Sequence, residues 1–190
     1  MKNVHEGDLV QHLSQIGIVP INGIDASFLT RLALCLEERF LFTCSVERPV
    51  GVPPTALNSV RRQLFLNTLL SRVAAALPQS DGYRMVVTDF DLYKTSHQFI
   101  FGEGNEDNRV AAISLHRLRT EFYGEQADQN LLFQRALKEA VHNIGHALGL
   151  RHCYNARCAM FLSGSIYDTD NKLSHFCEVC ERRMRKAMAG

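Results

Sequence analysis

The sequence lacks a marked excess of charge, a long apolar run and any internal repeat. Its 190 residues carry 21 lysines and arginines against 20 aspartates and glutamates, so the formal net charge is only +1. This balance gives no bulk attraction to nucleic acid or to an anionic membrane. No apolar stretch approaches the length of a membrane-spanning helix. With 46% hydrophobic residues, the chain is expected to be an ordinary globular protein with one hydrophobic core.

The first residues also lack the apolar core of a secretory leader. Residues 1–6 contain charged side chains and lead into more of them. We therefore expect a cytoplasmic protein that does not contact membranes. In a reducing compartment, clustered cysteines indicate metal ligands before disulfides.

Hydrophobic spacing predicts one α+β domain over residues 1–190. Residues 1–150 are expected to hold the sheet and main helices, and 151–190 to be a cysteine-rich end. Ser27 is expected to cap the first helix and Asn58 to begin the second. Residues 102–108 are predicted to be a polar turn. The expected helices cover about 27–40, 58–77, 128–150 and 176–187, and the expected strands cover 15–24, 40–46, 83–88, 98–102 and 110–114.

Three histidines near the end of the longest predicted helix have metal-ligand spacing. His142 and His146 are four residues apart, so both imidazoles project from one helix face. Gly149 can take the left-handed conformation that ends a helix, and the reversal can bring His152 towards the same ion. Three nitrogen ligands leave the fourth position of tetrahedral zinc open, as in catalytic sites. The remaining histidines lack this spacing and are expected to be structural or surface residues: His5, His12, His97, His116 and His175.

Two cysteine pairs follow the histidines. Cys153 and Cys158 form the first pair, and Cys177 and Cys180 the second. Four thiolates around one ion make a closed site, which is structural rather than catalytic. A pair of disulfides is the competing interpretation, disfavoured by the compartment. Because Cys153 directly follows His152, the cysteine site would brace the third histidine.

The combined pattern resembles the archaemetzincin family of zinc metalloproteases. The resemblance rests on His-x-x-x-His-x-x-Gly-x-x-His-Cys from His142, then Cys158-Ala159-Met160, then Cys177-x-x-Cys180. Segments 88–93, 99–102 and 113–118 are also similar to that family. The resemblance implies a metzincin-like fold, with a small twisted mixed sheet, a backing helix and an active-site helix ending at Gly149.

The resemblance also implies roles for individual residues. Two zinc ions are expected per chain, a catalytic one on the histidines and a structural one on the cysteines. Met160 would be the methionine of the Met-turn beneath the histidines. Residues 110–114 would be the edge strand that pairs with an extended peptide. The implied partner is a peptide or small protein acted on by a monomer.

One position departs from the family pattern. Asn143 stands where the family has the glutamate that takes a proton from the attacking water. An asparagine amide cannot accept that proton, so turnover is expected to be severely reduced. Three accounts stay open: a deliberately inactivated chain, a natural pseudo-protease that only binds peptides, or a substitute carboxylate. Glu139, one helical turn before His142, is the candidate substitute, although a supporting contact is its other interpretation.

The sequence therefore predicts a zinc-dependent metallopeptidase of archaemetzincin type whose general base is missing. Whether the chain is an active enzyme is left open. The alternative is a catalytically inactive, zinc-stabilised peptide-binding protein. A third hypothesis, a nucleic-acid-binding zinc ribbon, draws on the cysteine pairs and the basic residues at 182–186, but the near-neutral charge disfavours it.

Overall fold

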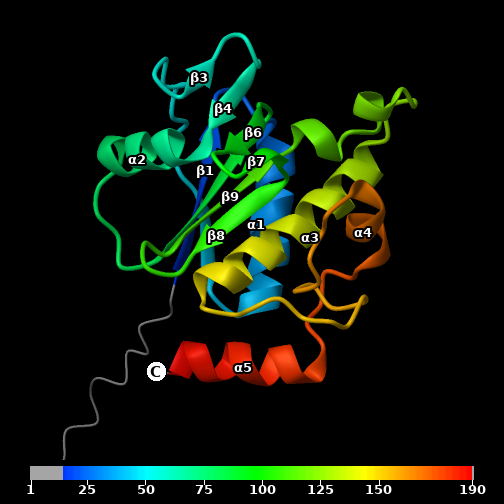
Figure 1. Ribbon diagram of the computed structural model, residues 1–190. Helices are drawn as coiled ribbons and strands as arrows, with labels where there is room; N and C mark the ends of the chain where they lie inside the picture. Colours follow the sequence, from blue (N-terminus) through cyan, green and yellow to red (C-terminus); the bar gives the residue numbers. More distant parts are fainter. Residues whose placement is uncertain (1–14, 190) are drawn as a thin grey trace, which may run out of the picture.

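The computed structural model describes residues 15–189 (Figure 1). The expectation that residues 1–6 do not begin a secretory leader, and the expectations for His5 and His12, concern residues outside the described part of the chain. The strands are β1 (Gln15–Ile21), β2 (Thr43–Val46), β3 (Leu57–Asn58), β4 (Gln63–Phe65), β5 (Tyr83–Thr88), β6 (Asp91–Lys94), β7 (His97–Ile100), β8 (Gly102–Asn105) and β9 (Val110–Ser114). The α-helices are α1 (Ala26–Phe40), α2 (Leu66–Ala76), α3 (Gln129–Ala147), α4 (Ile166–Asn171) and α5 (Glu178–Ala189), with 3-10 turns at His116–Leu118 and Thr120–Tyr123.

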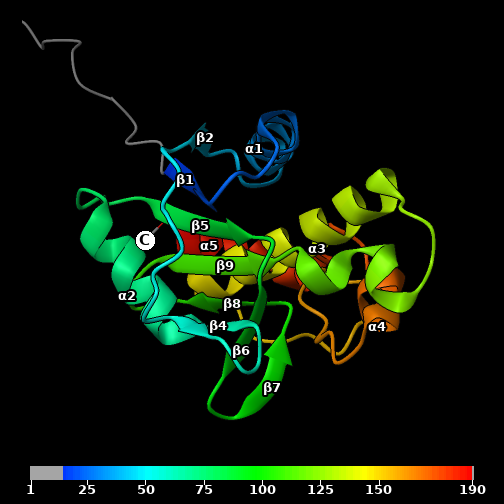
Figure 2. The same ribbon diagram turned by 90° about the horizontal axis from the view of Figure 1, so that it is seen from above.

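The main sheet has five strands in the order β2-β1-β5-β9-β8. Strands β2, β1, β5 and β9 are parallel, whereas β8 runs antiparallel to β9. Successive residues point to opposite faces. On β5, Met85 and Val87 join the core beneath α1 and α3, and Val86 joins the core beneath α2. Figure 2 shows α2 on the opposite side of this sheet from α1 and α3. The expected mixed sheet with a backing helix is therefore confirmed.

A second, smaller sheet has the order β3-β4-β6-β7. Strands β6 and β7 form a hairpin that continues directly into β8. Asp91, at the start of β6, accepts two-pronged hydrogen bonds from Arg117 and a 2.8 Å bond from Gln63. Arg117 also stacks on Phe99 of β7, with its guanidinium 4.0 Å from the ring centroid. This network fixes the hairpin relative to the main sheet.

Two expected helix starts are wrong. Asp25, rather than Ser27, caps α1, and its carboxylate accepts a 2.8 Å hydrogen bond from the Phe28 amide. The second helix begins at Leu66 instead of Asn58. The preceding residues form β3 and β4, joined by a turn in which Arg62 has a φ of 55°. Such a left-handed residue cannot continue an α-helix.

The structure also differs from the expectation around residues 102–114. The predicted polar turn contains β8, which pairs with β9 from Gly102 opposite Ile113 to Asn105 opposite Val110. Residues 110–114 are therefore internal, between β5 and β8, so the expectation that they form the edge strand is wrong. Within the described chain, the edge on this side is β8. The glycines at positions 102 and 104 led to the prediction of a turn here, because glycine is disfavoured in strands.

The C-terminal part packs on α3. Arg135 makes a two-pronged ion pair with Asp170, with N–O distances of 2.7 Å, and Lys138 donates to the Thr169 and Asp170 carbonyls. The short helix α4 is thereby held against α3, as Figure 1 shows. Farther along, Met184 of α5 is buried in the core beneath α1 and α3. No helix in residues 15–189 has the length and apolarity to cross a membrane.

Candidate metal centres and cleft

Helix α3 carries the first two histidines and ends as the sequence predicts. Asp128 caps its start by accepting a 2.9 Å hydrogen bond from the Leu131 amide. Gly149 follows the helix with a φ of +84°, a conformation that glycine adopts at little cost. A Cβ at this position would lie 2.6 Å from a carboxylate oxygen of Glu106. The turn at Gly149 reverses the chain and brings His152 beside the helix.

His142, His146 and His152 converge, with one ring nitrogen of each within 4.8 Å of the others. The His142 Nδ1 lies 2.8 Å from the Ala159 carbonyl oxygen, and the His146 Nδ1 lies 2.8 Å from that of Leu150. A carbonyl only accepts, so each Nδ1 must donate, and each Nε2 is left with a free lone pair. The two Nε2 atoms are 3.1 Å apart.

Two facing lone pairs at this distance repel each other unless a cation lies between them. Ligand nitrogens on tetrahedral zinc are separated by about 3.3 Å, because each Zn–N bond is about 2.0–2.1 Å long. Burial lowers the pKa of His142 to about 3, and the positive charge of Lys172 adds to the effect. Burial also lowers the pKa of His146 and His152. All three imidazoles are thus neutral near pH 7, the form that binds metal. The histidine cluster fits zinc.

The four cysteine sulfurs also lie within 4.8 Å of one another. The Sγ atoms of Cys153 and Cys177 are 3.8 Å apart, far beyond a disulfide bond of about 2.05 Å. Zn–S bonds of about 2.3 Å place tetrahedral ligand sulfurs about 3.8 Å apart. A hydrogen bond from the Cys180 amide is the main reason that the pKa of Cys177 is lowered to about 7. This cluster fits a structural zinc, and all six cysteines among residues 15–189 are free thiols.

The remaining cysteines lie away from both clusters. Cys35 and Cys44 are half-buried and pack against the core beneath α1 and α3. Burial raises the pKa of Cys44 to about 12, so this thiol stays protonated.

Met160 packs against the histidine-bearing helix α3. Its side chain is fully buried, and its carbonyl accepts a 2.9 Å hydrogen bond from the Cys153 amide. A Cβ on Gly145 would lie 2.5 Å from the Met160 sulfur. Glycine at position 145 therefore lets the Met160 side chain lie close to α3.

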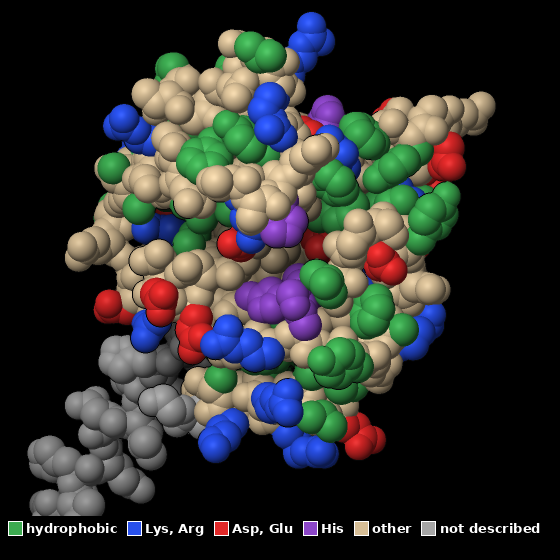
Figure 3. All heavy atoms as spheres, in the orientation of Figure 1, with side chains coloured by type: hydrophobic (Ala, Val, Ile, Leu, Met, Phe, Trp, Pro, Cys, Tyr) green, Lys and Arg blue, Asp and Glu red, His purple; other side chains and the backbone are tan. Residues whose placement is uncertain are grey.

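The histidines line a cleft of about 730 Å³. Figure 3 shows histidine side chains gathered near the middle of one face of the molecule, beside a hollow. One wall comes from α3 and from Leu162, Ser163 and Gly164, and the other from the β6–β7 hairpin and β8. The aromatic and apolar residues of 97–118 indicated a cleft lining in the sequence, but not which of them point inward. The second wall contains Lys94, His97, Phe99 and Glu103, so His97, expected to be structural or on the surface, faces the cleft.

Asn143 is 2% exposed and lines the cleft beside His142. Its Nδ2 donates a 2.8 Å hydrogen bond to the Glu139 carbonyl, one turn earlier on α3. On β8, a Cβ at Gly102 would lie 2.3 Å from this Nδ2, and one at Gly104 would lie 1.9 Å from the Asn143 carbonyl oxygen. The two glycines therefore allow β8 to lie directly against the helix at position 143.

Glu139 is buried and its Oε1 accepts three hydrogen bonds. The donors are the Lys172 ammonium at 2.9 Å, the Thr169 hydroxyl at 2.9 Å and the Ser163 hydroxyl at 3.0 Å. Burial alone would raise the carboxyl pKa, but the ion pair with Lys172 and the hydrogen bonds lower it overall. Lys172 itself is fully buried. Glu139 thus anchors the segment 163–172 to α3.

The comparisons with known proteins agree with this geometry. The model of peptidase family M54 matches residues 80–186. Over 178 residues the chain is 38% identical to an archaemetzincin of Pyrococcus furiosus, covering 90% of this chain and 92% of the relative. The chain belongs to the archaemetzincin family. This is a family of zinc metallopeptidases, which accounts for a histidine triad followed by a cysteine cluster.

Two solved structures share the archaemetzincin fold. The crystal structure of archaemetzincin from Methanopyrus kandleri superimposes with a TM-score of 0.81 and 27% identity, covering 93% of this chain and 96% of that one. A structure described as a zinc-dependent peptidase from Methanocorpusculum labreanum gives a TM-score of 0.81 at 26% identity, covering 89% and 99%. The expected family and fold class are both confirmed.

Proposed function

We propose that this archaemetzincin binds two zinc ions and extended peptides, and that its peptide-bond hydrolysis is severely reduced. His142, His146 and His152 would hold one ion, and Cys153, Cys158, Cys177 and Cys180 the other. The support is the fit of the donor atoms to tetrahedral zinc. Zinc on three histidines would polarise a water molecule and the peptide carbonyl. The alternative remains a pseudo-protease that binds peptides without cleaving them.

The observation that carries the proposal is the environment of Asn143. Its amide is buried against β8, and its Nδ2 is committed to the Glu139 carbonyl. An amide cannot take a proton at neutral pH. Losing a general base costs about 10²–10⁴ in rate.

Two carboxylates in the cleft could in principle replace the missing base, and both are already paired. Glu139 accepts from Lys172, Thr169 and Ser163. Glu103 of β8 forms an ion pair with Lys94. A lowered pKa makes the buried Glu139 a weak proton acceptor, so we assign it a positioning role.

Strand β8 supports the peptide-binding part of the proposal. It is the edge of the main sheet beside the cleft among residues 15–189, and an edge strand offers main-chain groups to an extended peptide. We propose that a substrate pairs with β8 and crosses the histidine cluster. The apolar Phe99 and Leu162 would contact its side chains.

We further propose that residues 1–190 act as one monomeric domain in the cytoplasm. A reducing compartment keeps cysteines available as thiolate ligands. A net charge of +1 supports peptide rather than nucleic-acid partners. On α5, Arg185 of the basic run is paired with Glu181 at 2.9 Å, which further reduces the local charge.

The test is a peptidase assay of the zinc-loaded protein beside its Asn143→Glu variant, on a mixed library of fluorogenic peptides. We expect Asn143→Glu to raise kcat/KM by about 10²–10⁴, because it restores a proton acceptor. Asn143→Gln is the matched control, with the length of glutamate but no basic group, and should stay at the original level. Zinc content must be equal in all three.

Equal activity of the original and the Asn143→Glu variant would contradict the proposal. Glu139→Gln and Glu103→Gln would then show which carboxylate acts as base. If all forms are inactive but bind library peptides with zinc-dependent affinity, the pseudo-protease alternative holds.

A further inference from the structure

The cleft wall formed by β7 continues into a cluster of aromatic side chains that belongs to neither metal centre. Phe99 of β7 lines the cleft. The Arg117 guanidinium lies 4.0 Å from the centroid of the Phe99 ring and 4.8 Å from that of Phe122. Tyr123 packs edge-on against Phe122, with 5.1 Å between the ring centroids. These four residues, Phe99, Arg117, Phe122 and Tyr123, form an aromatic platform that begins inside the cleft.

The aromatic platform is held in one arrangement although it lies at the surface. Asp91 accepts two-pronged hydrogen bonds from Arg117, and the Tyr123 hydroxyl donates a 2.9 Å hydrogen bond to the Arg117 carbonyl. Phe122 is nevertheless 42% exposed, and Tyr123 is 41% exposed. Side chains that are already ordered lose little conformational entropy when a ligand binds. Exposed aromatic rings of this kind are common at binding surfaces.

The arginines at the aromatic platform are both neutralised by carboxylates. Arg117 forms an ion pair with Asp91, and the neighbouring Arg119 forms one with Asp89. The platform therefore gives little advantage to an acidic ligand group. Its accessible parts are the faces and edges of aromatic rings, which favour aromatic side chains in offset or edge-to-face arrangements.

The aromatic platform lies along α3, about two helical turns before the first histidine of the cluster. The carbonyl of Leu118, beside Arg117, accepts a 3.0 Å hydrogen bond from Arg135. Arg135 precedes His142 by seven residues, which span about 10 Å of α-helix. An extended peptide advances about 3.3 Å per residue. The platform should therefore contact a side chain about three residues away from the peptide bond at the histidine cluster.

The direction of β8 determines which side of that bond the aromatic platform contacts. A Cβ at Gly102 would meet the Asn143 side chain, and one at Gly104 would lie 2.8 Å from the His146 Cβ. Strand β8 therefore runs in the same sense as α3, and the platform lies beyond the Gly102 end. A peptide paired antiparallel to β8, the more stable arrangement, runs the opposite way. Its residues C-terminal to the bond then lie towards the platform.

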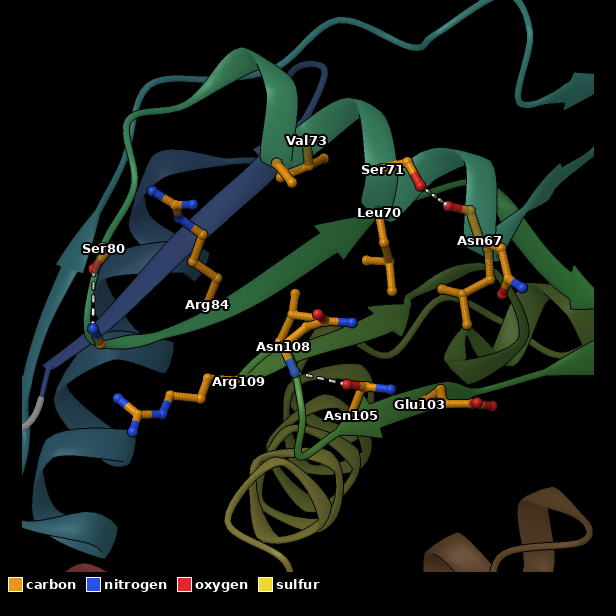
Figure 4. A pocket seen from close by; sticks show the side chains of 14 residues that line it. Asn67, Leu70, Ser71, Val73, Ser80, Arg84, Glu103, Asn105, Asn108 and Arg109 are labelled. Carbon is orange, nitrogen blue, oxygen red and sulfur yellow. Dashed lines mark hydrogen bonds between the residues drawn. The ribbon is translucent and has the colours of Figure 1, made fainter.

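A separate cavity of about 510 Å³ lies on the other face of the main sheet, beneath α2. Figure 4 shows its lining side chains, which include Leu70 and Val73 of α2. Glu103 is the one residue that lines both this cavity and the metal cleft. The cavity therefore does not extend the cleft, whereas the aromatic platform does so through Phe99.

We propose that the aromatic platform binds an aromatic side chain of the substrate, at the third residue C-terminal to the scissile peptide bond. This inference rests on the proposed function, because it takes the histidine cluster as a zinc site and β8 as the strand that pairs with the peptide. It adds the class of side chain that is recognised and its position in the substrate.

The test fixes the register of the ligand with a hydroxamate, a group that chelates zinc. Two probes carry a succinyl hydroxamate with a leucine-type side chain, then alanine, then either phenylalaninamide or alaninamide at the third position. Isothermal titration calorimetry measures their dissociation constants for the zinc-loaded protein, so the readout does not require turnover. The phenylalanine probe should bind at least about threefold more tightly, as expected for an aromatic pair.

Phe122→Ala should reduce this preference to less than about twofold, because the exposed ring is lost. Leu34→Ala is the matched control. It truncates an apolar side chain of α1 that is 56% exposed and lies outside the cleft lining, so the full preference should remain.

Equal binding of the two probes, or a preference that survives in Phe122→Ala, would overturn the assignment of the aromatic platform while leaving the proposed function intact. If neither probe binds the zinc-loaded protein, the proposed zinc and peptide site is contradicted, and this inference is overturned with it.

Discussion

The histidine cluster and the cysteine cluster meet at the His152–Cys153 peptide bond but are built differently. His142 and His146 stand on a buried helix, and backbone carbonyls fix both rings. The cysteines come from irregular chain after α3 and from the start of α5. The helix therefore orders its ligands through ordinary backbone geometry. The cysteine segment has less regular secondary structure, so its shape should depend more on whether an ion is bound.

The largest expected loss of stability comes from a substitution in the cysteine cluster. Cys177→Ser should remove the structural zinc and lower the free energy of unfolding by on the order of 5 kcal/mol, because a metal-organised segment loses its cross-link. Urea unfolding and elemental analysis of zinc measure both changes. Cys35→Ser, which changes a thiol outside the clusters, should keep the full zinc content. Native stability after loss of this zinc would show that the segment holds its shape unaided.

The second-largest loss of stability should follow removal of the Glu139–Lys172 ion pair. It tests whether this ion pair, rather than zinc, holds the segment 163–172 on α3. Lys172→Met should cost about 3–5 kcal/mol, because Glu139 is then buried without its cation. The double variant Glu139→Leu/Lys172→Met should recover most of that loss, since no charge is left unpaired. Thermal and urea unfolding of the three proteins give the comparison. A double variant as unstable as the single one would assign the loss to packing.

The third effect is a loss of stability of the metal-free protein on mild acidification. It should begin above the pH range in which carboxylates protonate, because it comes from His142. The pKa of His142 falls from 6.5 to about 3 on folding. Between these values the unfolded state binds more protons, so stability is full above pH 6.5 and decreases as the pH falls towards 3. From pH 7 to pH 5 the loss should be on the order of 2 kcal/mol.

Urea unfolding of the metal-free protein at the two pH values measures this loss. His142→Gln should remove most of the dependence. The same slope in that variant would assign the effect to other groups.

The smallest effect should come from His152→Ala. His152 is exposed, so with both forms free of metal their unfolding free energies should differ by about 1 kcal/mol or less. The zinc content of the loaded protein should nevertheless fall from two ions to one. A stability loss as large as that of Cys177→Ser would remove the contrast between the clusters.

The sequence was most informative where short-range geometry decides the structure. The helix repeat and Gly149 were enough to predict that His142, His146 and His152 converge. The cleft could not be predicted in the same way, because its second wall depends on how β8 packs against α3, which comes much later in the chain. Strand β8 consists of residues that disfavour strands, and it forms because Gly102 and Gly104 allow it to lie against Asn143. Likewise, nothing in the sequence indicated that Glu139 would form an ion pair with Lys172, which lies far along the chain.

The shared position of His152 and Cys153 also sets an order of assembly during synthesis. A ribosome makes the chain from the N-terminus, so α3 and its two histidines emerge before Cys177 and Cys180. Cys153, the neighbour of His152, cannot join a complete cluster of four cysteines until Cys177 and Cys180 have been made. The histidine site is therefore expected to reach its final shape late in biosynthesis, although most of its scaffold is present early.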